Sequence, residues 1–108
     1  MSLTEKTCVP CRGGIPPLTR EEAEGYLKDV DGWSLSDDAT RIRREFKFKD
    51  FAAALDFVNK VGQLAEEEGH HPDITVGYGY ADVTFFTHKI KGLHENDFIM
   101  AAKVNALA

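Results

Sequence analysis

The chain has 108 residues, of which 43% are hydrophobic and 29% charged, and its formal net charge at pH 7 is −5. This length suits one domain with a modest core, and the composition is ordinary for a globular protein. The negative charge argues against a nucleic-acid-binding surface, which needs a clustered basic face. The apolar runs are too short to span a membrane and no signal segment opens the chain, so we expect a cytoplasmic protein with no membrane contact.

Cys8 and Cys11 form a Cys-x-x-Cys pair in a segment rich in proline and glycine. A tetrahedral zinc site needs four ligands, and no second pair follows nearby. A redox motif would need a strand before it and a helix after it, whereas residues 12–17 have the composition of a loop. We interpret residues 1–17 as an irregular arm with reduced cysteines. A metal site or a disulfide, including one shared between subunits, is the alternative.

The ordered domain is expected over residues 18–108, and it opens with a helix. Thr19-x-x-Glu22 is a capping-box pattern that begins this helix, and Asp31-Gly32 ends it. A short strand is expected at residues 33–35, followed by a turn.

From Thr40 to Lys49 apolar and charged residues alternate. This alternation predicts a strand with one buried face, and therefore an antiparallel sheet. Arg44 interrupts the apolar side, and we expect it at an edge of the sheet or in solvent.

The longest helix is expected over residues 51–68. Asp50 is its candidate N-cap, and Gly69 suits the left-handed position that ends many helices. Apolar residues recur at three- and four-residue intervals and form a wide stripe. The stripe comprises Phe51, Ala54, Leu55, Val58, Val61, Leu64 and Ala65.

Two β-rich runs follow, at residues 74–78 and 81–88, and Gly79 between them predicts a hairpin. His88 falls on the more polar face of the second run. Residues 95–107 predict a last helix, whose inward side is expected to carry Phe98, Ile99, Ala102 and Ala106. The order helix, two strands, helix, two strands, helix (α-β-β-α-β-β-α) indicates an α+β fold with the helices on one face of the sheet.

Residues that can carry chemistry concentrate where the long helix ends, in the segment from Glu66 to Pro72. His70 and His71 are adjacent imidazoles beside a block of three carboxylates, and His88 comes one hairpin later. Imidazole can give or take a proton near neutral pH. Two alternatives stay open: a histidine pair that caps the helix dipole, and a metal site built from the three rings. Metal binding is awkward because neighbouring side chains on an extended segment diverge.

The spaced residues Glu66-x-x-x-His70-His71-Pro72, Tyr78, His88 and Asp97 resemble the signature of the pterin-4a-carbinolamine dehydratases. Gly32-Trp33, the run from Phe46 to Phe51, and Thr87-His88 extend the similarity over residues 18–108. Animal members carry Asp and Arg where this chain has Gly69 and Asn96. The resemblance implies a four-stranded antiparallel sheet covered by three helices, and assembly into homodimers or homotetramers.

The resemblance also implies an activity, which is dehydration of 4a-hydroxytetrahydropterin to quinonoid dihydropterin and water in tetrahydrobiopterin recycling. His70, His71 and His88 are then the catalytic residues, with His70 and His88 as the acid–base pair and His71 in binding. The implied substrate-binding residues are Trp33, Glu66, Pro72, Thr87 and Asp97. The partner is a small-molecule pterin, and the reaction needs no metal and no redox cofactor.

Several of these residues also have a purely structural interpretation. Trp33 fits a hydrophobic core, and Asp97 fits a capping carboxylate in the first turn of a helix. His94 falls at a helix N-cap and is not assigned to the site, whereas Glu67 and Glu68 are expected in solvent. For the whole chain the alternative is a protein-binding coactivator module without essential catalysis, because the animal members also act as dimerisation cofactors for a homeodomain transcription factor.

Overall fold

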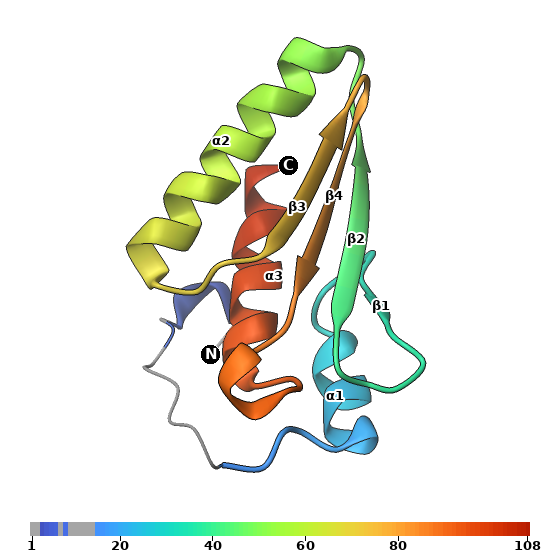
Figure 1. The fold of residues 1–108 in the computed structure, drawn as a ribbon, viewed down its shortest axis with the longest axis vertical. Helices are drawn as coiled ribbons and strands as arrows, with labels where there is room; N and C mark the ends of the chain where they lie inside the picture. The colour runs from blue at the N-terminus through green and yellow to red at the C-terminus, as the bar shows by residue number, and fades with distance from the viewer. Residues whose placement is uncertain (1–2, 7, 9–14) are drawn as a thin grey trace.

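The structure, a computed structural model, describes residues 3–6, 8 and 15–108, and its elements follow the predicted order (Figure 1). Three helices alternate with two pairs of strands, and two short 3₁₀ turns accompany them in the described residues. The elements are η1 (Leu3–Glu5), α1 (Arg20–Leu27), β1 (Ser34–Leu35), β2 (Ile42–Lys47), α2 (Phe51–Glu68), β3 (Asp73–Gly77), β4 (Tyr80–Phe85), η2 (His88–Ile90) and α3 (Glu95–Leu107).

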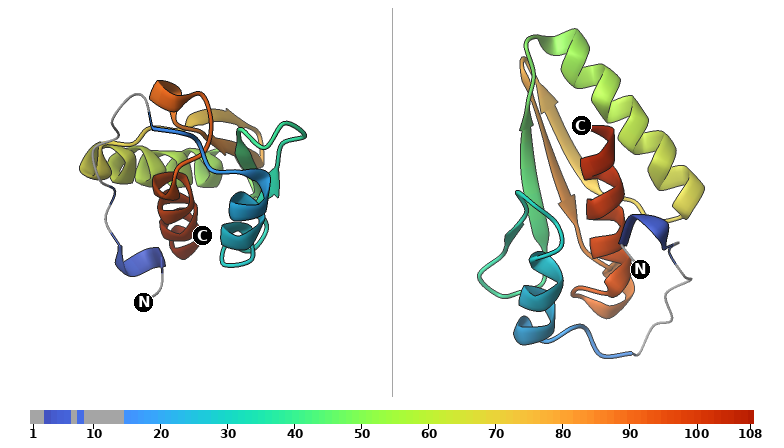
Figure 2. Two further views of the ribbon diagram at one scale, coloured as in Figure 1. Left: turned by 90° about the horizontal axis from the view of Figure 1, so that it is seen from below. Right: turned by 180° about the vertical axis from the view of Figure 1, so that it is seen from behind.

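The four strands form one antiparallel sheet in the order β1-β2-β4-β3. Ile42 lies opposite Phe85 and Phe46 opposite Ala81, and all four side chains are buried. Side chains alternate along a strand, so Arg43 points to the other face of the sheet. The three helices lie on the side of the buried face (Figure 2). The predicted α+β fold, with its four-stranded antiparallel sheet, is therefore confirmed.

The helix ends are set by the residues that the sequence indicates. Thr19 and Glu22 form a reciprocal capping box at the start of α1. The Asp50 carboxylate accepts a hydrogen bond of 2.8 Å from the Ala53 N–H and so caps α2. Gly69 ends α2 with φ 68°, a left-handed conformation that costs glycine little because it has no Cβ.

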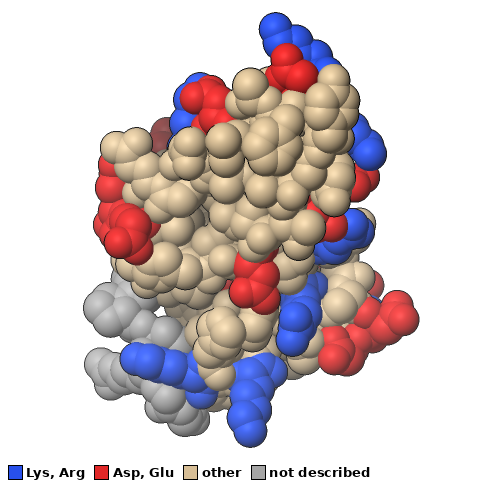
Figure 3. All heavy atoms as spheres, turned by 45° about the horizontal axis from the view of Figure 1, so that its top comes forward, with Lys and Arg blue, Asp and Glu red and all other residues tan. Residues whose placement is uncertain are grey.

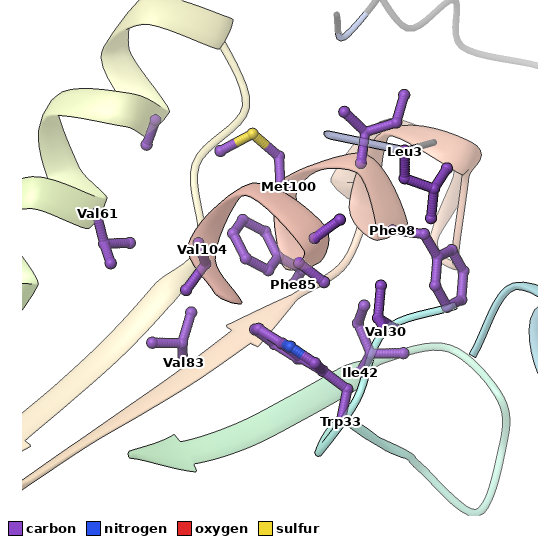
Figure 4. Packing of buried hydrophobic residues seen from close by; sticks show 14 of the residues in the cluster. Leu3, Val30, Trp33, Ile42, Val61, Val83, Phe85, Phe98, Met100 and Val104 are labelled. Carbon is purple, nitrogen blue, oxygen red and sulfur yellow. The ribbon is translucent and has the colours of Figure 1, made fainter. Parts of the chain in front are cut away.

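The hydrophobic core lies between the sheet and α3, which is buried along most of its length. Figure 4 shows Phe85 of β4 among side chains of α3, with Trp33 beside it. The ring centroids of Trp33 and Phe85 are 5.7 Å apart. Full burial of one such aromatic ring stabilises the fold by roughly 1.5–3 kcal/mol. This cluster therefore holds the end of β4 against α3.

The apolar stripe of α2 differs in part from the prediction. Phe51 and Leu55 are 44% and 41% exposed, whereas Phe57, which the predicted stripe omits, is 4% exposed. The buried face runs through Ala54, Phe57, Val61 and Ala65. Phe51 and Leu55 belong to the apolar stripe of α2, but they lie at the edge of the stripe that faces away from the sheet. A helix can turn only part of a wide stripe toward a sheet.

Three further expectations are corrected. Strand β4 ends at Phe85 and not at His88, because a bridge between Thr87 and Gly92 closes a turn that contains η2. Strand β2 covers residues 42–47, which is shorter at both ends than predicted. In α3, Ala106 is exposed because the last turn extends past the core.

Arg44 lies just beyond the two β2 residues that pair with β1, at an edge of the sheet as predicted. Its guanidinium donates hydrogen bonds to the Asp31 carbonyl and to Asn105 Oδ1, and lies 4.4 Å above the Phe46 ring. The charged head is therefore satisfied at the rim of the core while its stem covers apolar surface.

The described part of the N-terminal arm packs on the domain. Leu3 is 8% exposed and belongs to the core cluster, and the Lys6 ammonium lies 2.6 Å from Glu95 at the start of α3. Cys11 and several of its neighbours lie outside the described residues. Among the described residues, no helix is both long and apolar enough to cross a membrane.

Replacing Asp50 by Ala should lower the free energy of unfolding by about 1 kcal/mol, because the Ala53 N–H would lose its capping acceptor. Asp50→Asn is the matched control, since an amide oxygen can cap as well, and should retain most of the stability. Urea denaturation followed by circular dichroism measures both. An Asn variant as unstable as the Ala variant would contradict the capping role.

Candidate active site

A pocket of about 480 Å³ opens where the end of α2, the segment after β4 and the start of α3 meet. These segments are far apart in the sequence, and the antiparallel sheet and α3 bring them together. The pocket is lined by Cys8, Glu68, Gly69, His70, His71, Phe86, Thr87, His88, Lys89 and Asn96. All three histidines that the sequence singles out thus face one hollow, together with Thr87.

His70 is the most enclosed of the three imidazoles, with a side chain 12% exposed. The left-handed turn at Gly69 directs His70 back toward the sheet. The backbone N–H of His70 donates a hydrogen bond of 3.2 Å to the Ala65 carbonyl. The ring lies nearly parallel to that of Phe85, with centroids 6.0 Å apart. Its Nε2 lies 2.6 Å from Asp97 Oδ1. Packing and one polar contact therefore fix the orientation of this ring.

Asp97 is completely buried, and both carboxylate oxygens have partners. Oδ2 accepts hydrogen bonds from the Thr87 hydroxyl at 2.8 Å and from the His94 N–H at 2.9 Å, while Oδ1 faces His70. The second of these bonds completes a capping box with His94 at the start of α3. Asp97 is therefore a helix cap that also supports His70, and it does not itself line the pocket.

The contact between His70 and Asp97 links the tautomer of the ring to the charge of the carboxylate. An ionised carboxylate can only accept hydrogen bonds, so beside an ionised Asp97 the Nε2 atom would be the donor. Nδ1 would then be the nitrogen that can accept a proton. A buried carboxylate that orients an imidazole in this way is a recurring arrangement in proton-transfer sites.

His71 and Glu66 form a second imidazole–carboxylate pair, but at the surface. The His71 ring bonds to the Glu66 carboxylate, and the two side chains are 60% and 77% exposed. Exposed pairs of this kind contribute little to stability because water screens them. His71 lines the pocket, whereas Glu66 and Pro72 do not.

His88 lies at the start of η2 and lines the same pocket. It is exposed, and its ring centroid lies 4.1 Å from that of Phe86. The predicted location on a strand is wrong, yet the turn still delivers the ring to the hollow. Phe86 and Lys89 also line the pocket, and apart from their closeness to His88 no sequence signal indicates either residue.

Trp33 does not line the pocket. It is 5% exposed, packs against Phe46 and Phe85, and donates a hydrogen bond of 2.8 Å to Asn105 Oδ1. It reaches the site indirectly, because Phe85 also stacks on His70. The surroundings of Trp33 are those of a core residue, as the structural interpretation expects.

Cys8 supplies a wall of the pocket that the sequence does not predict. Its N–H donates to Glu68 Oε1 at 2.9 Å, and its Sγ lies 3.8 Å from the Asn96 carbonyl. Glu68, expected in solvent, has a side chain only 14% exposed and lies 3.7 Å from Lys103. Burial, and then the nearby charge of Glu68, raise the pKa of the Cys8 thiol to about 12.

No group of three or more His, Cys, Asp or Glu side chains within residues 3–6, 8 and 15–108 is arranged to hold a metal ion. The three histidines line one pocket but do not form such a group. The Cys8–Cys11 pair cannot be described as a unit, since Cys11 lies outside the described residues.

Comparison with known families agrees with this geometry. The family "Pterin 4 alpha carbinolamine dehydratase" matches residues 16–107, which is most of the chain. The chain belongs to this family.

Two bacterial relatives and one crystal structure illustrate the match. A protein of Methylococcus capsulatus named as a pterin-4-alpha-carbinolamine dehydratase is 64% identical over 107 residues, covering 99% of this chain and 94% of that protein. A protein of the same name from Halorhodospira halophila is 63% identical, with 99% and 98% covered. The crystal structure of a "transcriptional coactivator/pterin dehydratase" from Brucella melitensis is 41% identical, with a TM-score of 0.80 over 85% of this chain and 98% of that one.

The buried state of Cys8 gives a prediction about thiol chemistry. With Cys11 replaced by Ser, alkylation of Cys8 by iodoacetamide at pH 8 should be about 10³-fold slower in the folded than in the urea-unfolded protein, because the pKa rises from 9.0 to about 12 and the thiolate is the nucleophile. Above pH 9 the unfolded rate should level off while the folded rate keeps rising. A folded rate within tenfold of the unfolded rate would show that Cys8 is not held in the pocket wall.

Proposed function

We propose that this protein is a dehydratase that converts 4a-hydroxytetrahydropterin to quinonoid dihydropterin and water. Membership of the dehydratase family gives the reaction class. The observation that supports it most is the convergence of His70, His71 and His88 on one pocket, with His70 supported by the buried Asp97. The substrate is a flat bicyclic ring, which suits a hollow of about 480 Å³ walled by aromatic and imidazole rings.

The reaction needs two proton transfers and no change of oxidation state. The bond between C4a and its hydroxyl oxygen breaks, and that oxygen gains a proton and leaves as water. A ring nitrogen loses a proton, so that its electron pair completes the new double bond. Each proton transfer by a positioned side chain typically contributes ~10²- to 10⁴-fold. Two imidazoles of suitable protonation therefore account for catalysis without any further group.

His70 is the proposed base. Its Nε2–H is held by Asp97, which leaves Nδ1 to take the proton from the ring nitrogen. The imidazolium that forms is then paired with a carboxylate that is already oriented and is buried away from water. Thr87 and the His94 N–H act through Asp97 and are positioning groups.

His88 is the proposed acid that protonates the leaving hydroxyl. It stands at the exposed side of the pocket, where it can recover a proton from water after each turnover. His71, with Glu66 behind it, is proposed to bind the pterin and not to transfer a proton. Trp33 is proposed to act indirectly, by backing Phe85 beneath the His70 ring. Pro72 follows His71 and would fix the direction of the chain there, because its φ is restricted.

The protein is proposed to act on a reduced pterin in the cytoplasm, as part of tetrahydrobiopterin recycling, and to form a homodimer or homotetramer. Phe51, Leu55 and Tyr78 are 44%, 41% and 77% exposed. The start of α2, with Phe51, and the turn between β3 and β4, with Tyr78, lie at the same end of the molecule (Figure 1). Figure 3 shows a broad area without charged side chains in the upper part of its view. Large apolar side chains that are exposed close to one another commonly mark an interface.

A protein-binding coactivator role is the second candidate. The name of the Brucella melitensis structure joins both roles for that protein. The exposed apolar residues of α2 would serve such a role as well as self-association. The histidines would then be dispensable, which separates this candidate from the enzyme.

Replacement of His70 or His88 by Gln should lower kcat for carbinolamine dehydration by about 10²- to 10⁴-fold, since each removes one proton transfer. His71→Gln should mainly raise KM. The measurement is the absorbance change of the pterin in a coupled recycling assay, with the uncatalysed dehydration subtracted.

Lys60→Gln is the control for these variants. Lys60 is an exposed residue of α2 that pairs with Asp56 and lies outside the pocket lining, so this variant should keep the wild-type rate. Unchanged rates for folded His70→Gln and His88→Gln proteins would end the enzyme proposal and favour the binding module.

The double replacement Phe51→Glu with Leu55→Glu should convert the assembled protein to monomers, because charged groups buried in an apolar interface are costly. Gln63→Glu, an exposed polar position on the same helix, is the control and should leave the assembly intact. Size-exclusion chromatography with light scattering gives the masses. A wild-type monomer, or a double variant that stays assembled, would refute this interface.

A further inference from the structure

A second hollow of about 240 Å³ adjoins the candidate active site. It is lined by Thr40, Arg41, Phe86, His88 and Lys91. Phe86 and His88 belong to both hollows, so their paired rings form a shared wall, with centroids 4.1 Å apart. A molecule seated beside His88 in the first hollow therefore has a short route over this wall into the second.

The second hollow differs from the rest of the molecule in charge. The chain as a whole carries a net charge of −5, yet the residues that line this hollow include two cations and no carboxylate. Asp38 is close in sequence, but its Oδ1 accepts hydrogen bonds from the Ser36 hydroxyl, the Thr40 N–H and the Thr40 hydroxyl, and Asp38 does not line the hollow. Lys89 adds a third cation on the side of the first hollow.

The two cations are positioned by the fold. The Arg41 guanidinium lies 4.3 Å from the centroid of the Phe86 ring, a cation–π contact that holds its plane against the shared wall. Lys91 adopts φ 52°, a left-handed conformation that is uncommon for residues other than glycine and asparagine. The turn around it is fixed by the paired backbone bonds between Thr87 and Gly92. The backbone of Lys91 is therefore held in place, and its side chain lines the second hollow.

We propose that the second hollow binds an anionic group, a phosphate or a carboxylate, on the side chain of the pterin substrate. The inference rests on the proposed function, since it requires the bicyclic ring in the first hollow. The ring system would lie among the three histidines, and its substituent would cross the wall formed by Phe86 and His88. The anion would then lie between Arg41 and Lys91, where the guanidinium supplies directed N–H donors and the ammonium a point charge.

The test compares the binding of three stable oxidised pterins that differ only in their side chain: 6-hydroxymethylpterin, its phosphate monoester and pterin-6-carboxylate. Quenching of pterin fluorescence measures binding without any need for turnover. The wild-type protein should bind the phosphate monoester roughly tenfold more tightly than the neutral pterin at low ionic strength, and added salt should reduce the ratio. The carboxylate shows whether a shorter, singly charged group suffices.

Arg41→Gln and Lys91→Asn should each reduce the ratio of anionic to neutral affinity, and the double variant should bring it close to one. Asn suits the left-handed position, so Lys91→Asn removes the charge and keeps the backbone. Lys60→Gln is the control, because Lys60 lies on α2 and pairs with Asp56, and it should leave the ratio unchanged.

Three outcomes would overturn the proposal. One is equal affinity for neutral and anionic pterins. Another is a Lys60→Gln variant that loses as much of the preference for the anionic pterin as Arg41→Gln or Lys91→Asn does. The third is inorganic phosphate that binds as tightly as the phosphorylated pterin, which would indicate a free-anion site. The proposed dehydration can hold in all three cases, because neutral carbinolamine turnover is measured separately.

Discussion

The buried carboxylate of Asp97 is the interaction on which the site and part of the fold depend. It begins α3 by accepting the His94 N–H, ties the segment after β4 through Thr87, and orients His70 at the end of α2. These three segments, together with Cys8, line the pocket. A carboxylate removed from water is costly unless hydrogen bonds compensate it. The protein therefore keeps this group only in the arrangement that also assembles the pocket.

The same interaction explains why the three histidines are not equivalent. His70 is enclosed between Phe85 and Asp97, so its orientation is set by buried groups that water does not screen. His71 and His88 stand at the surface, where the Glu66 contact and the Phe86 ring guide them more loosely. A reaction that takes one proton from the substrate and gives another to a departing hydroxyl can use this asymmetry, with one fixed group and one that exchanges with solvent.

Local sequence signals gave most of the fold because they act through neighbouring residues. The capping box of Thr19 and Glu22, the Asp50 cap, the left-handed Gly69 and the strand alternation all have the predicted geometry. What failed depended on tertiary packing. Only the position of α2 on the sheet determines that Phe57 is buried while Phe51 is exposed, and only the bridge between Thr87 and Gly92 moves His88 from a strand to a turn.

The sequence grouped the three histidines, but it could not show what surrounds them. Cys8 reaches the pocket through contacts with Glu68 and Asn96, which are 60 and 88 positions away along the chain. Arg41 and Lys91 likewise meet at one hollow although a helix and a hairpin separate them. Charge composition argues against a broad basic surface, yet an acidic chain can still gather a few cations where topology brings two turns together. The charge of a small binding site is thus set by which loops meet there. The net charge of the chain sets only the electrostatic potential that surrounds the site.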